Sequence, residues 1–244
     1  MSCSISDIKS SIFIIIMPIE KYTYLILMAS CLLFPLAFSF DKRVAFYKNW
    51  SKLFVATIIP ATFFILWDVW FTGRGIWSFS DTYTIGYRLL NLPIEEWLFF
   101  LVIPYCSIFV YEVLKSYFPK ADYNQQLFWG LIALGVVFIV LAFVYITHAY
   151  TFWNFTFNAV FLAILLLNIW FLEYITHFVL TFLICLVPML IVNGVLTSLP
   201  VVEYNTMHIT NFKIYTIPFE DFFYYFLLLM MNVLIYQRLL KPKD

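Results

Sequence analysis

Seven apolar segments of about twenty residues each follow one another along this chain of 244 residues. About 20 apolar residues in a helix suffice to cross the hydrocarbon core of a bilayer, whereas a barrel strand needs only about 9–11. Helices also satisfy their own backbone hydrogen bonds in lipid. The boundary near Glu173 is the least distinct, which leaves six or eight spans as alternatives. The sequence predicts an all-α, polytopic membrane helical bundle with spans at 22–40, 51–72, 93–114, 126–147, 151–172, 174–197 and 218–238.

The composition agrees with a lipid environment and excludes some functions. Hydrophobic residues make up 64% of the chain and charged residues 11%, whereas a soluble domain is about half apolar and about a quarter charged. The formal net charge of zero gives no indication of a nucleic-acid partner. No GxGxxG segment follows a strand, the three histidines are scattered, and the cysteines have no paired spacing. We therefore expect no disulfide framework, no bound cofactor and no metal site. The cysteines are Cys3, Cys31, Cys106 and Cys185.

The basic residues predict an orientation in the membrane. With seven spans, nine of them fall on one side and five on the other. Because cytoplasmic loops carry the excess of lysine and arginine, we expect an integral membrane protein with its N-terminus outside and its C-terminus inside. The larger group is Lys42, Arg43, Lys48, Lys52, Lys115, Lys120, Arg238, Lys241 and Lys243, and the smaller group is Lys9, Lys21, Arg74, Arg88 and Lys213.

One motif occurs twice, 125 residues apart. Residues 93–96 read PIEE and residues 218–221 read PFED. Each copy has a proline at the predicted first position of an apolar helix, two carboxyl groups in the first turn, and aromatic rings just behind them. Acidic residues are costly in a membrane segment and are usually functional there. The candidate catalytic residues are Glu95, Glu96, Glu220 and Asp221.

The motif belongs to a longer internal repeat. A shift of 125 places residues 68–114 on residues 193–239, and rare polar residues then meet polar residues of similar kind. Asp68 meets Asn193, and Arg88 meets Lys213. We expect two parallel repeats of three helices, at 1–120 and 151–244, joined by a connecting helix within 121–150. Parallel repeats usually place a site between the two halves.

The carboxyl groups allow two interpretations. As structural groups, they would be ionised, would complement the helix dipole and would lie at a wet interface, a stabilisation of about 0.3–1 kcal/mol each. As catalytic groups, they would lie in a dry site, where burial raises a carboxyl pKa by roughly 3–5 units. One carboxyl could then hold a proton as an acid, and its partner could act as a base.

Several other residues could support such a site. Aromatic faces near the motifs could shelter a positive charge, although an interfacial aromatic belt is the alternative for many of them. Asp68 and Asn193 could hold a motif carboxyl in position, or be ordinary interfacial residues. Arg88 and Lys213 could be interface anchors or counter-ions. The aromatic candidates are Trp77, Phe79, Phe99, Phe100, Tyr204 and Tyr224.

These segments together resemble the membrane lycopene cyclases of the heterodimeric or fused type. The resemblance covers most of residues 55–239, and the chain departs from it at Tyr236 and Gln237, where the family would have a Trp-Glu pair. The matching segments are Asp68, 75–79, 92–100, 193–197, 200–202, Tyr204 and 217–224.

The resemblance implies a lycopene β-cyclase, an intramolecular lyase or isomerase of carotenoid biosynthesis, in the cytoplasmic membrane and without a flavin. An acid protonates the C1=C2 bond of a ψ end group, the ring closes, and a base removes the C6 proton. Glu95 and Glu96, or Glu220 and Asp221, would be the acid and the base, in either order. The expected partners are lycopene and the lipid bilayer, and other carotenoid-pathway enzymes are conceivable. An ε-ring or C50 carotenoid cyclase, a carotenoid-binding scaffold and a proton-coupled transporter are the alternatives.

Overall fold

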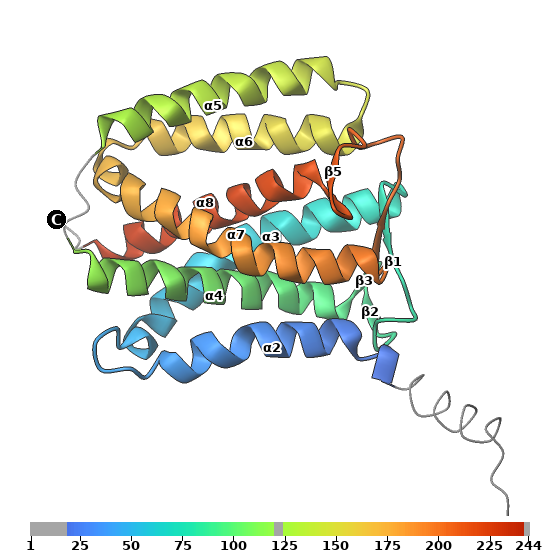
Figure 1. Ribbon diagram of the computed structural model, residues 1–244, viewed down its shortest axis with the longest axis horizontal. Coiled ribbons are helices and arrows are strands. Elements are labelled where there is room, and N and C mark those ends of the chain that lie inside the picture. The colour runs from blue at the N-terminus through green and yellow to red at the C-terminus, as the bar shows by residue number, and fades with distance from the viewer. Residues whose placement is uncertain (1–18, 120–123, 242–244) are drawn as a thin grey trace, which may run out of the picture.

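The computed structural model describes residues 19–119 and 124–241, so Cys3, Lys9, Lys120 and Lys243 lie outside the described residues. Seven helices within these ranges form one bundle (Figure 1). They are α2 (Thr23–Phe38), α3 (Trp50–Gly73), α4 (Ile94–Tyr117), α5 (Gln125–Val144), α6 (Ala149–Leu167), α7 (Ile175–Ser198) and α8 (Phe219–Leu240). Two 3-10 helices, η1 (Phe46–Asn49) and η2 (Ile169–Tyr174), precede α3 and α7.

The helices have the length and composition of membrane spans. Six of those described are long and apolar enough to cross a bilayer, and α2, with 16 residues, is shorter. At 1.5 Å per residue α2 is about 24 Å long. The predicted helical membrane bundle is therefore confirmed, and the chain is an integral membrane protein.

Several predicted span boundaries were wrong by one to five residues. The fifth span was expected to reach residue 172, but α6 ends at Leu167, because Asn168 leaves the helical conformation. The Asn168 side chain bonds the carbonyl of Ile164 and the indole of Trp170, and so replaces helical hydrogen bonds. Pro93 and Pro218 were expected inside the helices, but both have extended backbones and precede the first helical residue.

Six short strands among the described residues lie at one end of the bundle, and some of them are labelled there in Figure 1. Strands β2 and β3, and likewise β5 and β6, form tight hairpins that end in the motif prolines, which is why these prolines are extended. The strands are β1 (Trp77–Phe79), β2 (Arg88–Leu89), β3 (Leu92–Pro93), β4 (Val202–Tyr204), β5 (Lys213–Ile214) and β6 (Ile217–Pro218).

The two halves of the chain are related by an approximate two-fold axis. Strand β1 pairs with β4, with Trp77 opposite Tyr204 and Phe79 opposite Val202. A shift of 125 residues exchanges these two pairs, as two-fold symmetry requires. Leu90 and Tyr215, also 125 residues apart, both have left-handed backbones, with φ of 59° and 58°. The repeat predicted from the polar residues is thus a repeat of backbone conformation as well.

The halves interlock in the centre of the bundle. Helix α3 packs against α8 of the other half, and α7 packs against α4. Helix α2 packs on α4 at one side, whereas α5 packs on α6 at the opposite side (Figure 1). The helices that carry the motifs, α4 and α8, are the two most buried of the candidate spans. The motif carboxyls therefore enter the bundle where the two repeats meet.

The hydrogen bond between α4 and α8 at the end opposite the strands can be tested. Gln237 Nε2 donates to the Tyr111 hydroxyl at 2.6 Å, and both side chains are buried. Tyr111→Phe leaves the amide without this partner, so we expect a loss of about 1–3 kcal/mol of stability. Thermal unfolding in detergent measures it. The double variant Tyr111→Phe/Gln237→Leu should recover part of the loss, and the exposed Tyr87→Phe should have no effect. A Tyr111→Phe protein as stable as wild type would show that this bond does not stabilise the bundle.

Candidate active site

The second acid of each motif faces a common pocket of about 60 Å³ at the interface of the two halves. Glu96 and Asp221 line it together with Asp68 and Asn193. The three carboxyl residues are no more than 7% exposed. The shift of 125 relates Glu96 to Asp221 and Asp68 to Asn193, so each half of the chain contributes the same two positions. The pocket is one shared site and not two separate ones.

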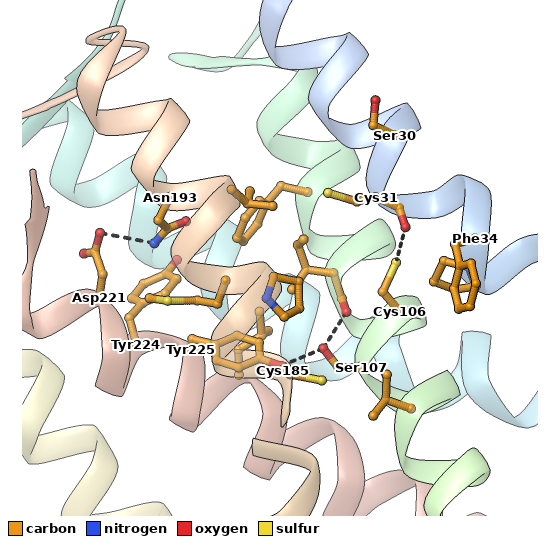
Figure 2. Close-up of a pocket in the computed structure, with 18 residues that line it drawn as sticks. Ser30, Cys31, Phe34, Cys106, Ser107, Cys185, Asn193, Asp221, Tyr224 and Tyr225 are labelled. Carbon is orange, nitrogen blue, oxygen red and sulfur yellow. Dashed lines mark hydrogen bonds between the residues drawn. The ribbon is translucent and has the colours of Figure 1, made fainter. Parts of the chain in front are cut away.

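Asp221 is held by three hydrogen-bond donors. The Tyr150 hydroxyl donates to Oδ1 at 2.8 Å, and the Tyr204 hydroxyl donates to Oδ2 at 2.9 Å. Asn193 Nδ2 also donates to Oδ2 at 3.3 Å, a bond drawn in Figure 2. Burial, followed by the charge of Asp221, raises the pKa of Tyr204 well above its usual range. Tyr204 therefore keeps its proton and acts as a donor.

Glu96 and Asp68 have a different arrangement in the other half. The Tyr24 hydroxyl donates to Glu96 Oε2 at 2.6 Å, and the Tyr224 hydroxyl donates to Asp68 Oδ1 at 2.8 Å. The two carboxyl groups also line the same pocket of about 60 Å³. Two ionised carboxylates buried in so small a pocket would repel each other, which favours one proton held by the pair.

The first acid of each motif holds a loop and does not line the pocket. Glu95 Oε1 accepts the backbone N–H of Ile85 at 2.7 Å, and Glu220 Oε1 accepts that of Thr210 at 2.7 Å. These contacts are again 125 residues apart. Glu220 Oε1 also accepts the Thr151 hydroxyl at 2.5 Å. The geometry therefore separates the two acids of each motif, which the sequence had grouped together.

Most of the aromatic candidates surround the carboxyl groups. Phe100 is the exception: it is fully buried and stacks on Phe64, with ring centroids 5.8 Å apart. The predicted aromatic residues that line the pocket are Trp77, Phe79, Phe99, Tyr204 and Tyr224.

The basic candidates lie away from the pocket. Arg88 forms an ion pair with Asp81 at 2.7 Å and donates to the carbonyl of Phe79 at 2.9 Å, so it braces the β1–β2 connection. Lys213 is exposed on β5. Neither residue lines the pocket. Within 19–119 and 124–241, no three His, Cys, Asp or Glu side chains are grouped to hold a metal ion.

A larger apolar cavity of about 340 Å³ adjoins the pocket. It shares Phe99, Asn193, Asp221 and Tyr224 with the pocket and is lined by α2, α4, α7 and α8 (Figure 2). Its lining reaches Val110, which lies 14 residues beyond Glu96 on α4 and so about 21 Å along the helix. The cavity and the pocket together form an elongated, mainly apolar space that ends at buried carboxyl groups.

Buried acids at the end of an apolar cavity, within a membrane bundle, define a membrane protein with a site for a lipid-soluble ligand. The family model described as lycopene cyclase matches residues 21–114 and 147–239. These two regions cover most of the chain and coincide with its two structural halves. The chain belongs to the lycopene cyclase family.

Two relatives are bifunctional lycopene cyclase/phytoene synthases. The one from Aspergillus oryzae is 27% identical over 94 residues, which are 38% of this chain and 16% of the relative. The one from Phaeosphaeria nodorum is 37% identical over 65 residues, which are 26% of this chain and 11% of the relative. The matches thus span less than a fifth of the length of either relative. No solved structure gives a significant match.

Two residues that contact the second acids of the motifs, Glu96 and Asp221 (the inner acids), were not predicted from the sequence. Tyr24 and Tyr150 bond Glu96 and Asp221 from the first turns of α2 and α6. They are 126 residues apart, one position from the repeat of 125. A search for tyrosines recurring near this spacing could have found them.

The first acids of the motifs, Glu95 and Glu220 (the outer acids), hold loops, and this role predicts a difference between two substitutions. Glu95→Gln keeps an oxygen that can accept the Ile85 N–H, whereas Glu95→Ala leaves that N–H without its partner. We expect Glu95→Ala to lose about 1–3 kcal/mol of stability and Glu95→Gln to lose clearly less. Thermal unfolding in detergent compares them. Equal losses would show that the charge of Glu95, and not its hydrogen bond, is what the loop requires.

Proposed function

We propose that this protein converts the ψ end groups of lycopene to β rings, giving γ-carotene and then β-carotene. The observation that carries the proposal is the meeting of Glu96, Asp68 and Asp221 in one pocket that continues into an apolar cavity. An extended polyene fits a narrow apolar space, and its end group would then lie among the carboxyl groups. The family match supports this substrate class.

The reaction needs one proton to be given and one to be taken away. Protonation of the terminal double bond at C2 leaves a tertiary cation at C1. The C5=C6 double bond attacks C1, which closes the six-membered ring and moves the cation to C5. Removal of the C6 proton forms the new C5=C6 bond. The sum is an isomerisation without net redox change, so buried carboxyl groups suffice as acid and base.

The surroundings of the pocket suit a carbocation. The faces of Trp77, Phe79 and Tyr224 can attract a positive charge by cation–π interaction. Negative charge on the carboxyl groups adds to this attraction, which is strong in a site of low dielectric. Neither lysine nor arginine lines the pocket among the described residues. The carboxyl groups are buried and the adjoining cavity is mainly apolar, which limits the access of water to the cation.

One shared pocket implies that one end of the substrate reacts at a time. Both repeats contribute to the same site, so a second ring requires the half-cyclised product to leave and return in the opposite direction. γ-Carotene would then be a free intermediate.

The described basic residues support the orientation expected from the sequence. At the end of the bundle opposite the strands, the described members of the larger basic group lie between α2 and α3, in the first turn of α3 and at the ends of α4 and α8. Lys21, Arg74, Arg88 and Lys213 lie at the strand end. We propose that the C-terminal end faces the cytoplasm and that the pocket lies near the outer face of the cytoplasmic membrane.

Expression in a host that accumulates lycopene tests the activity. Wild type should convert lycopene to γ- or β-carotene, as seen by chromatography of the extracted pigments. Glu96→Gln keeps the shape of the side chain but removes an acid, so we expect at least about a 100-fold loss of conversion. Glu203→Gln, at an exposed carboxyl on β4, is the matched control and should remain active. Unchanged lycopene with well-inserted wild type, or full activity of Glu96→Gln, would contradict the proposal.

The cavity can be tested separately from the carboxyl groups. Val110→Trp should fill part of the cavity far from Glu96 and block entry of the polyene, so conversion of lycopene should fall at least about tenfold. Leu101→Trp changes a lipid-exposed position on the same helix and serves as control. Membrane levels of both variants must match wild type. Normal conversion by Val110→Trp would show that the substrate lies elsewhere.

A further inference from the structure

We infer that the two halves of the pocket have opposite roles: the Asp68–Glu96 pair donates the proton that starts the reaction, and Asp221 accepts the proton that ends it. This inference rests on the proposed cyclisation and adds Asp68 to its catalytic groups. It is carried by the differences between two sets of residues that the repeat would otherwise make equivalent.

The first difference is at the position next to the inner acid. In the second half Asn193 donates an amide N–H to Asp221 at 3.3 Å. In the first half the equivalent position holds a second carboxyl group, Asp68, which lines the same pocket as Glu96. An amide brings its own hydrogen to a bond, whereas two carboxyl groups buried in one pocket repel each other unless one of them holds a proton. The first half therefore stores a transferable proton where the second half has a fixed amide.

The second difference is in the phenol groups. Asp221 receives the Tyr204 hydroxyl at 2.9 Å, whereas the residue equivalent to Tyr204 is Phe79, which has no donor. With Tyr150 and Asn193, Asp221 accepts three hydrogen bonds. Three donors match the acceptor-only oxygens of an ionised carboxylate. The second half is thus built around an anion, which is the form required of a base.

The third difference is a hydrogen bond across the interface that the repeat does not duplicate. Tyr224 donates to Asp68 across the interface at 2.8 Å, whereas its equivalent, Phe99, has no hydroxyl to offer Asn193. Glu96, Asp68 and Asp221 all line the same pocket of about 60 Å³. An end group between them could receive a proton from one side and lose one to the other.

The proton balance of this cycle is complete. The pair Asp68–Glu96 loses one proton to C2, and C1–C6 bond formation moves the cation to C5. Asp221 gains the proton from C6, so the neutral ring product leaves. The pair is then doubly ionised, and Asp221 is protonated. Between turnovers Asp221 releases this proton to water and the pair takes one up from water, which restores the starting state.

Solvent deuterium separates the two roles. Membranes holding the protein are incubated in D2O with unlabelled lycopene, and the pigments are analysed by chromatography and mass spectrometry. Wild type should add one deuterium per ring, at C2. Asp68→Asn copies the contact of Asn193 with Asp221, so it should fold, yet should lose ring formation at least about 100-fold and leave lycopene unlabelled. Asp221→Asn should also lose the β ring, but its cation still forms and reverts, so recovered lycopene should contain deuterium.

Each result decides a separate point. Labelled lycopene from Asp68→Asn and none from Asp221→Asn would reverse the roles. Absence of label from both variants would also overturn the assignment, because a base is not needed for protonation. Full activity of Asp68→Asn would exclude Asp68 as a proton source. In all these cases wild type still forms labelled rings, whereas failure of wild type to form rings would contradict the proposed function itself. Glu203→Gln should behave as wild type.

Discussion

Burial of carboxyl groups at one end of an apolar bundle is the constraint on which this structure depends. An acid in such a place must be paired, hydrogen-bonded or protonated, because an isolated charge is too costly there. The tyrosines of α2, α6 and α8, the backbone N–H groups of two loops and one asparagine supply these partners. The loops before the hairpins of α4 and α8 bond Glu95 and Glu220, which leaves Glu96 and Asp221 to face the shared pocket.

The repeat explains why both motifs meet at one site and why the two sides of that site differ. Two similar halves interlock through α3 with α8 and α7 with α4, which brings the two motifs to one interface. The loop-holding contacts of Glu95 and Glu220 are the same in both halves. The pocket-facing positions differ: the repeat relates Asp68 to Asn193 and Phe79 to Tyr204. The positions that are the same in both halves therefore stabilise the fold. The positions that differ make one side of the pocket suited to donate a proton and the other suited to accept one.

Much of the fold could be predicted from the sequence, because the length of an apolar segment directly limits how it can sit in a membrane. The end of α6 was missed, since a single asparagine in an apolar run gives little warning that its side chain will replace helical hydrogen bonds. The acids that meet in the pocket were among the candidates because polar residues are rare in this chain. The split between Glu95 and Glu96 was not predictable: neighbours on a helix point about 100° apart, and only packing decides which one meets the other repeat. Tyr24 and Tyr150 were hidden among 17 tyrosines.

The most direct test of one shared site is a structure of the Glu96→Gln variant with lycopene bound, determined in lipid. We expect one polyene in the cavity between α2, α4, α7 and α8, with its end group between Asp68 and Asp221. An end group bound away from these carboxyl groups, or two end groups held at separate positions in the two repeats, would contradict a single shared site.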